Sequence, residues 1–532
     1  MDPPGQPVAR AALRGRCHAR GRTGGATLPQ RRRGAAGADG RGACRARNSS
    51  SQHQVGRARN EGIDSGAWHG RSLAASGAVG IVDGRVANNE ERPVISNNRD
   101  LPFWKEYPER DSEWVRQYPT KHVAVSEEDV FRKEPMGFYV HIPFCNRLCF
   151  SCPYIKHQTD KSVTQRYVDA LKKEMSNYAA RPYVKEHQLT VGYIGGGTPT
   201  ALSTEQLVDL LTHMKAEFDM KPGMEISTES TPLDISEQKA SALLEHGVNR
   251  ISLGVQTFID QELEDLGRAG NAAMIIDAIK MLQRIGVPRI NIDLMHGLNG
   301  QTMESWHQSL QTAVDLGVSS VSFYTYMEFA QISTKRRKLP PVPPRETVDE
   351  MFIYAAQFLT RNGYEGYFGD CFALPGQRPA YGSVTWTEEF PIIPMGPTAT
   401  GHLKDYWYFN EPSIELYIEA VNAGRLPIAM GKQISAEESL RRAVMLGIKS
   451  SRLDRQRFRE LHGVDFAHLF PEEIADLQAK GLVRLTDEAM EVVGPKGWYY
   501  MDNISKAFYS KEFRRYPQHL GANISPFIIK AA

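Results

Sequence analysis

Residues 137–152 read GFYVHIPFCNRLCFSC, a short apolar run followed at once by a loop that carries three cysteines. The run GFYVHI has the length and the nearly continuous apolar character of a parallel strand that is covered on both faces. Cys145, Cys149 and Cys152 follow it at the spacing C-x3-C-x2-C. Reactive groups of α/β folds sit at the carboxyl ends of parallel strands, so this stretch predicts a fold class and the position of a site.

The same order of strand, turn and helix recurs downstream. Five further strand candidates lie at 190–196, 224–228, 250–255, 289–295 and 320–326. The segments between them are amphipathic and predict helices, one of which opens with the capping pattern STEQ. Six such units predict an α/β protein whose parallel strands form a partial (β/α)6 barrel or an open sheet.

Composition and pattern divide the chain into five parts. Residues 1–95 are rich in Arg and Gly with little apolar periodicity, and they predict a disordered extension. Residues 96–136 predict an arm that packs on the core, and residues 137–345 contain the six strand–helix units. Residues 346–430 are expected to extend the barrel and shape a substrate pocket. In residues 431–532, helices followed by a hairpin-like run predict a C-terminal helical, winged-helix-like domain.

Overall composition indicates which partners and which cellular compartment to expect. The formal net charge is +2 over 532 residues, and the C-terminal part has no dense basic helix, so we expect no nucleic-acid partner. No run approaches the roughly 18 apolar residues of a membrane span, and no apolar segment follows the N-terminal arginines as in a secretory signal. Six cysteines do not make a disulfide scaffold, which favours a cytoplasmic protein without a membrane partner.

Three kinds of site compete for the three clustered cysteines. Core packing is disfavoured, because cysteines at steps of four and three residues in a Pro- and Asn-containing loop do not follow a packing pattern. A structural zinc site needs a fourth protein ligand, for which Cys371 and His157 are candidates. An iron–sulfur cluster takes thiolate ligands, and three thiolates leave one iron of a [4Fe–4S] cube open for a substrate or cofactor.

The cysteine spacing after a first strand resembles the radical S-adenosylmethionine (SAM) superfamily. The surrounding YVHIPFC is similar to the branch that contains oxygen-independent coproporphyrinogen III oxidase, and the resemblance spans roughly residues 100–515. Further segments resemble that branch in order along the chain: YIGGGTPT (193–200), EISTES (225–230), LGVQTF (253–258), LGR (266–268), NIDLMHGLNGQT (291–302) and FALPG (372–376). The C-terminal part also looks like the corresponding (HemN-like) domain.

The resemblance implies a [4Fe–4S] cluster, SAM, and the formation of a 5′-deoxyadenosyl radical that takes a hydrogen atom from the substrate. It implies that Cys145, Cys149 and Cys152 hold the cluster. It implies further that cluster-bound SAM is contacted or lined by Tyr139, Gly195, Gly196, Gly197, Thr198 and Glu229. Gln256, Arg268 and Asp293 match positions that the family associates with a second SAM molecule.

Three departures bear on the reaction. The family usually has an aromatic residue directly before the third cysteine, where this chain has Ser151, with Phe150 one place earlier. Coproporphyrinogen oxidases carry a further Cys where this chain has Tyr154, and the family's His two places after the LGR arginine is Gly270. We therefore expect methyl or methylene transfer from a second SAM to a natural product, including cyclopropane formation. The alternatives are coproporphyrinogen III oxidation and a non-catalytic heme chaperone.

The expected partners follow from the same resemblance. They are a small-molecule substrate, a reductant such as flavodoxin or ferredoxin, and, for the one-carbon reaction, a partner methyltransferase.

Overall fold

The computed structural model describes residues 122–123, 136–149, 152, 157–327, 338–387, 391–403 and 406–514. The extension predicted over 1–95 lies outside these residues, as does almost all of the arm predicted over 96–136. Among the described helices, none combines the length and the apolar character that crossing a bilayer requires.

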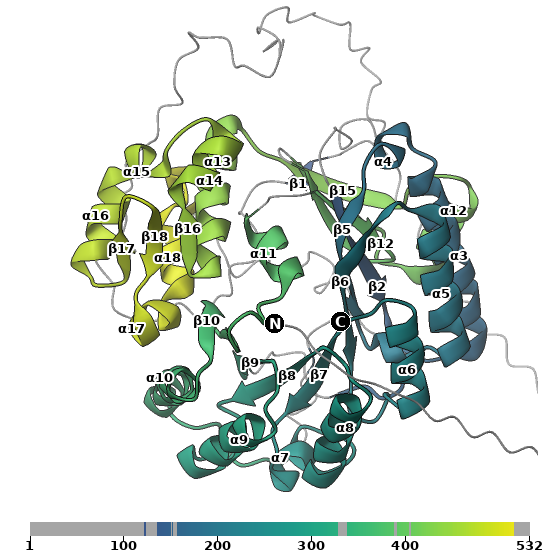
Figure 1. The fold of residues 1–532 in the computed structure, drawn as a ribbon, viewed down its shortest axis with the longest axis horizontal. Helices are drawn as coiled ribbons and strands as arrows, with labels where there is room; N and C mark the ends of the chain where they lie inside the picture. Colours follow the sequence, from purple (N-terminus) through teal and green to yellow (C-terminus); the bar gives the residue numbers. More distant parts are fainter. Residues whose placement is uncertain are drawn as a thin grey trace, which may run out of the picture. The chain divides into compact units, whose positions relative to one another are not determined.

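A curved sheet of 13 strands organises the described residues (Figure 1). In spatial order the strands are β1 (His122–Val123), β15 (Ile428–Gln433), β14 (Tyr406–Asn410), β13 (Thr400–Leu403), β12 (Ile392–Met395), β2 (Met136–Ile142), β5 (Leu189–Gly196), β6 (Met220–Ser230), β7 (Arg250–Gln256), β8 (Arg289–His296), β9 (Ser320–Thr325), β11 (Cys371–Ala373) and β10 (Glu365–Phe368).

The six strands predicted from the sequence, β2 and β5 to β9, are confirmed and pair in parallel in chain order. Side chains alternate along them, because successive residues of a strand point to opposite faces. Phe138, Ile251 and Ile292 point into the apolar core. Tyr139 and Asp293 belong to the other set of positions, on the inner face of the curve, which is largely polar.

Helices cover the outer face of this sheet (Figure 1). Their bounds are α3 (Lys161–Ala179), α4 (Pro182–Lys185), α5 (Thr204–Glu217), α6 (Glu237–Glu245), α7 (Asp260–Asp265), α8 (Ala272–Arg284), α9 (Met303–Asp315), α10 (Arg345–Arg361) and α12 (Ile414–Asn422). The predicted STEQ signal is a capping box, in which Ser203 and Gln206 each bond the other's backbone amide at the start of α5. These helices bury one face against the strands and form the main apolar core.

The sheet continues beyond the six predicted strands on both sides. β12 pairs in parallel with β2, with Ile392 opposite Gly137, and β13, β14, β15 and β1 follow as antiparallel strands. At the other end β11 and β10 add antiparallel strands beside β9. All of these strands except β14 and β15 have four residues or fewer, and β10, β12, β13 and β15 contain Gly or Pro, so their periodicity is too weak to separate them from loops.

Helix α11 (Ala380–Thr387) is tied to the inner face of the sheet through Glu225 on β6. The Glu225 carboxylate accepts hydrogen bonds from the backbone amides of Ala380 (2.9 Å) and Tyr381 (3.2 Å), and it pairs with Arg289 at 2.5 Å. A carboxylate at the start of a helix is favourable because it satisfies unbonded amides and complements the helix dipole.

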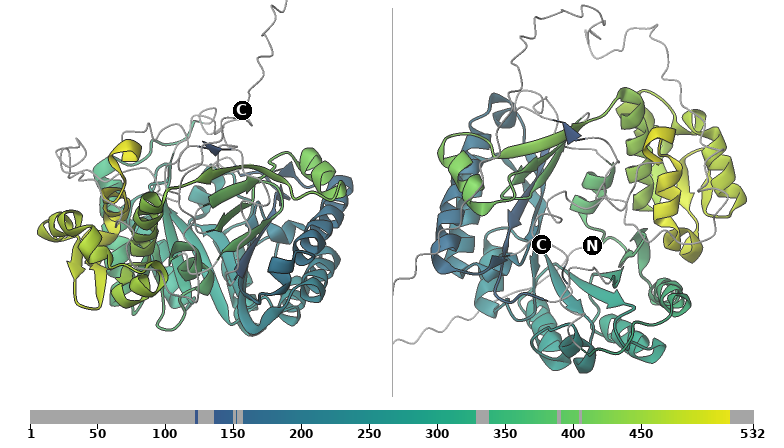
Figure 2. Two further views of the ribbon diagram at one scale, coloured as in Figure 1. Left: turned by 90° about the horizontal axis from the view of Figure 1, so that it is seen from above. Right: turned by 180° about the vertical axis from the view of Figure 1, so that it is seen from behind.

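The C-terminal residues build a second apolar core around a small sheet (Figure 2). Its strand order is β16–β18–β17, and the β17–β18 pair is the predicted hairpin. The elements are α13 (Ala436–Gly447), η3 (Ile448–Ser450), β16 (Arg452–Asp454), α14 (Arg455–His462), α15 (Phe466–Leu469), α16 (Pro471–Ala479), β17 (Val483–Leu485), β18 (Ala489–Val492), α17 (Gly494–Tyr499), α18 (Met501–Ala507) and α19 (Lys511–Arg514).

Candidate functional site

The cysteine loop begins where β2 ends. Its base is held by a short parallel pair between β3 (Phe144–Cys145) and β4 (His157–Gln158), in which Phe144 lies opposite His157. Cys145 is buried, whereas Cys149 and Cys152 are partly exposed, and none of the three is in a disulfide. The loop therefore presents three thiols at the carboxyl edge of the parallel strands, as the sequence predicts.

The glycine-rich segment after β5 packs directly on this loop. The amides of Gly197 and Thr198 donate to the carbonyls of Ile142 and Phe144, each at 2.8 Å. A Cβ atom at Gly197 would lie 2.7 Å from the Phe144 carbonyl oxygen and 3.0 Å from the Cys145 Sγ. Only glycine fits between these atoms, so the segment fixes the position of the first cysteine whatever else it binds.

Gly195, Gly196 and Tyr193 surround the carboxylate of Glu229. Tyr193 donates its hydroxyl hydrogen to Oε1 at 2.8 Å, and the Gly196 amide donates to Oε2 at 3.2 Å. Gly196 has φ +120°, a conformation that L side chains rarely adopt, and a Cβ at Gly195 would lie 3.2 Å from the carboxylate. The Tyr139 ring stacks on Tyr193 with centroids 6.1 Å apart. The structure thus brings Tyr139, the glycines and Glu229 together.

Arg268 joins the cysteine loop to the end of β7. Its guanidinium donates to the Cys149 Sγ at 3.5 Å and to the Gly254 carbonyl. Gln256, at the end of the same strand, has φ +74°. A non-glycine residue in this region stores strain, and such residues cluster at functional sites. Gln256 and Arg268 therefore lie at the same sheet edge as Cys149.

Asp293 lies on the inner face of β8. It accepts hydrogen bonds from Asn291 Nδ2 at 2.9 Å and from Ser252 Oγ at 3.3 Å. Burial raises the pKa of Asp293 to about 6, although Arg250, the two hydrogen bonds and Arg268 act in the opposite direction. The carboxyl group is therefore poised to change charge near neutral pH.

His141 and Glu174 are two site-proximal residues that the sequence analysis missed. The His141 ring bonds the Tyr139 hydroxyl at 3.1 Å and the Thr398 hydroxyl at 3.2 Å, and burial lowers its pKa to about 4. The Glu174 carboxylate accepts the Gly396 amide at 2.7 Å and so fixes the loop that carries Thr398. Position 141 lies two residues after Tyr139 in the same strand, so strand alternation alone could have found it.

The residues around the loop suit an iron–sulfur cluster better than a structural zinc ion. Of the two candidates for a fourth zinc ligand, Cys371 bonds Ser322 at 3.5 Å on β9, and His157 lies in β4 opposite Phe144. Thr198 donates to the Cys145 Sγ at 3.5 Å, as Arg268 does to Cys149. Hydrogen bonds to the ligating sulfurs are one of the means by which proteins tune iron–sulfur clusters.

Of the residues on which the departures rest, Phe150, Ser151 and Tyr154 lie outside the described residues, whereas Gly270 is described and has φ +95°.

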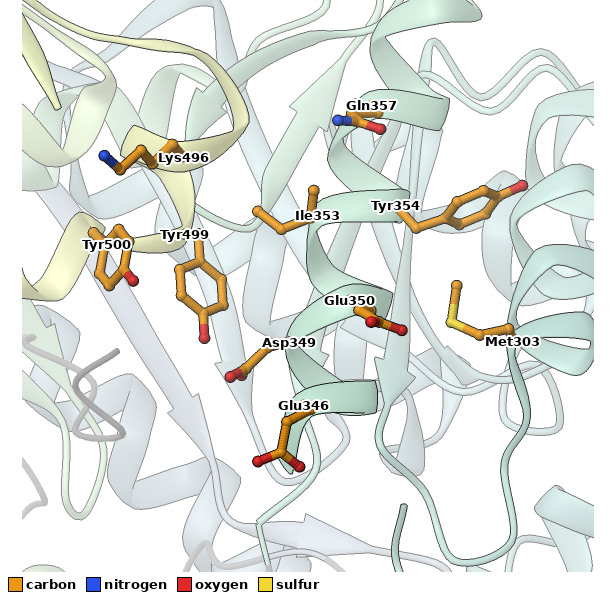
Figure 3. A pocket seen from close by; sticks show the side chains of 10 residues that line it. All are labelled: Met303, Glu346, Asp349, Glu350, Ile353, Tyr354, Gln357, Lys496, Tyr499 and Tyr500. Atoms are coloured by element: carbon orange, nitrogen blue, oxygen red, sulfur yellow. The ribbon is translucent and has the colours of Figure 1, made fainter. Parts of the chain in front are cut away.

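A pocket of about 540 Å³ lies between α10 and the C-terminal helices (Figure 3). It is lined by Met303, Glu346, Asp349, Glu350, Ile353, Tyr354, Gln357, Lys496, Tyr499 and Tyr500. None of the predicted site residues contributes to it, so we do not assign the reaction to this pocket.

Comparison with known protein families gives two matches. Residues 139–313 match the radical SAM superfamily, and residues 434–499 match the HemN C-terminal domain.

Individual relatives agree with these families. The heme chaperone HemW of Bacillus subtilis is 31% identical over 66% of this chain and 93% of its own length. The oxygen-independent coproporphyrinogen III oxidase of Escherichia coli is 28% identical over 71% of this chain and 86% of its own length. The solved structure of coproporphyrinogen III oxidase (HemN) from Escherichia coli matches with a TM-score of 0.65, 26% identity, and coverage of 74% of this chain and 96% of the other. These relatives give no support to the expected methyl or methylene transfer, and the tetrapyrrole alternatives fit better.

Proposed function

Because this chain belongs to the HemN-like branch of the radical SAM superfamily, we propose that it oxidises a tetrapyrrole in the manner of oxygen-independent coproporphyrinogen III oxidase. The family uses a [4Fe–4S] cluster and SAM. The proposal is carried by one observation, the convergence of Cys145, Cys149, Glu229 and Arg268 at one edge of the sheet. In the proposed reaction a propionate side chain gives a hydrogen atom to the 5′-deoxyadenosyl radical, releases CO2, passes one electron to an external one-electron acceptor, and becomes a vinyl group.

In this proposal Cys145, Cys149 and Cys152 hold the cluster, which when bound supplies the electron that cleaves SAM. Thr198 and Arg268 donate hydrogen bonds to two of the sulfurs and so orient them. Glu229, oriented by Tyr193 and the Gly196 amide, offers a carboxylate to the amino group of SAM.

The remaining predicted residues complete the SAM site. Tyr139 forms one wall, and the backbone of Gly195, Gly196 and Gly197 allows close approach. Gln256, Arg268 and Asp293 are proposed for a second SAM molecule. The electron donor is proposed to be a flavodoxin or a ferredoxin.

Heme binding without catalysis is the second candidate. It is favoured by the match to HemW of Bacillus subtilis, which spans 93% of that protein. The two candidates share a tetrapyrrole ligand and differ in whether SAM is consumed.

An anaerobic assay tests the proposal. The protein is reconstituted with iron and sulfide, reduced with dithionite, and incubated with SAM and coproporphyrinogen III. Mass spectrometry then measures 5′-deoxyadenosine and the loss of carboxyl groups. We expect both products, and we expect Cys149→Ala to abolish both and to lower the iron content. Cys371→Ala is the matched control, because it removes a thiol that lies outside the loop and is expected to retain iron. Heme binding without 5′-deoxyadenosine would favour the chaperone instead.

A further inference from the structure

Arg250 opens β7 and points to the inner face of the sheet. Its neighbours in the strand, Ile251 and Leu253, lie in the apolar core on the outer face, so alternation directs Arg250 inward. It lies opposite Ser227 on β6 and Arg289 on β8. Ser227 in turn lies opposite Tyr193, whose hydroxyl bonds Glu229. Arg250 is therefore one layer below the proposed SAM-binding carboxylate.

Among the described residues, none accepts a hydrogen bond from the Arg250 guanidinium or forms an ion pair with it. The residue is 5% exposed, and its Nε is buried without a hydrogen-bond partner among the described residues. No described carboxylate forms an ion pair with it. Burying a guanidinium without a partner is costly, and the group does not escape the cost by losing its proton.

The two carboxylates near Arg250 form their hydrogen bonds and ion pairs with other groups. Glu225 pairs with Arg289 and accepts the backbone amides of Ala380 and Tyr381. Asp293 is bonded by Asn291 and Ser252. Both carboxylates lie within electrostatic range of Arg250 without bonding it. The Arg250 head is therefore left with bonding capacity that the described residues do not use.

The surroundings suit an anionic group attached to an apolar ring system. Tyr193 and Tyr367 lie within electrostatic range of Arg250, and the Tyr193 ring packs against Tyr381 with centroids 4.9 Å apart. A guanidinium offers two parallel donors that match the two oxygens of a carboxylate. Aromatic walls beside such a fork are typical of sites that orient a ring system by one charged substituent.

We propose that Arg250 is a specificity residue that binds a carboxylate of the substrate on the inner face of the sheet. This inference rests on the proposed function, in which that carboxylate is a propionate side chain of the tetrapyrrole. The carboxylate of SAM is the other source of the same chemistry, and the experiment separates the two.

The first experiment compares a charged and an uncharged ligand. Coproporphyrin III and its tetraamide are titrated into the reconstituted protein, and binding is followed by porphyrin absorbance. Wild type should prefer the free acid. Arg250→Gln should bind the acid roughly 10-fold more weakly or worse, while tetraamide binding and SAM affinity stay unchanged. Arg250→Lys should be intermediate, because an ammonium keeps the charge and loses the fork. Arg284→Gln, which removes an arginine whose side chain is 63% exposed, is the control.

Two results of this experiment would overturn the assignment. One is equal binding of the acid by wild type and Arg250→Gln, and the other is a loss of SAM affinity instead of porphyrin affinity. If Arg250→Gln does not fold, the absence of an acid preference in wild type would overturn it equally.

A second experiment is independent of the tetrapyrrole. Sodium propionate should raise the melting temperature of wild type more than that of Arg250→Lys, with sodium chloride at the same concentration as reference. If porphyrins do not bind but propionate stabilises wild type selectively, the proposed function fails and the carboxylate site stands. If porphyrins bind without an acid preference and propionate has no selective effect, the site fails and the proposed function stands.

Discussion

Replacing Gly197 with alanine should both destabilise the protein and disturb the cysteine loop. The new methyl group would lie 2.7 Å from the Phe144 carbonyl oxygen and 3.0 Å from the Cys145 Sγ. The nearer of these atoms is backbone, so no rotamer change relieves the contact, and the segments must separate by ~0.7 Å to restore an ordinary distance. Overpacking of this kind costs about 1–3 kcal/mol, and we expect the upper half of that range because two backbone hydrogen bonds join the same segments.

Two measurements test the effect of Gly197→Ala on stability and on the cysteine loop. Urea unfolding of the purified variant gives the change in the free energy of unfolding, and iron and sulfide analysis after anaerobic reconstitution gives the cluster content per chain. Gly286→Ala is the control, because Gly286 has φ +82° with nothing within 4 Å of the added Cβ. That control should lose about 1 kcal/mol through backbone strain and retain its iron. A Gly197→Ala protein that keeps wild-type iron content and unfolds within ~0.5 kcal/mol of wild type would refute the packing argument.

Three further predictions concern the carboxylates and the C-terminal core. Because the pKa of Asp293 is raised to about 6 in the folded state, its ionisation should reduce stability as pH rises from about 4 to about 6. Asp293→Asn should gain up to ~3 kcal/mol relative to wild type over that interval in urea unfolding, and a constant difference would contradict this. Tyr193→Phe removes a hydrogen bond to Glu229, so calorimetry should show weaker SAM binding, while the free energy of unfolding falls by only ~1 kcal/mol. Unchanged SAM affinity would show that Tyr193 has only a structural role. Asp502→Asn should lower the free energy of unfolding by about 3 kcal/mol or more, because Lys449, with a side chain 1% exposed, loses the charge of the carboxylate that lies 2.6 Å from it; Lys449→Met in the same background should recover part of that loss.

The sequence predicts the six parallel strands because each is a compact apolar run between turn residues. It also predicts that Cys145, Glu229 and Arg268 lie at one sheet edge, since all three follow strand ends. β10 to β13 escape prediction because they are three or four residues long. Their pairing depends on tertiary contacts that no local pattern encodes.

The inner face of the sheet is harder still to predict. Position 197 must be glycine because a side chain there would meet the Phe144 carbonyl in another strand. The Arg250 Nε that no described residue bonds and the raised pKa of Asp293 both arise from burial among residues distant in the chain. Their spacing in the strands predicts that Arg250 and Asp293 share one face of the sheet. It cannot show which of these side chains has hydrogen-bond partners.

The parallel pairing of β2 with β12 has a consequence for biosynthesis. β2 is made early, whereas the strand that covers its free side follows about 250 residues later, with Ile392 opposite Gly137. At translation speeds of roughly 5–20 residues per second, that edge waits on the order of 10–50 s on the ribosome for its neighbour. An apolar strand with an unpaired edge is a template for association with other chains. The nascent protein therefore passes through a long interval in which the β2 edge can pair with another chain. A chaperone that covers this edge would favour folding, and slow translation of the residues before β12 would favour aggregation.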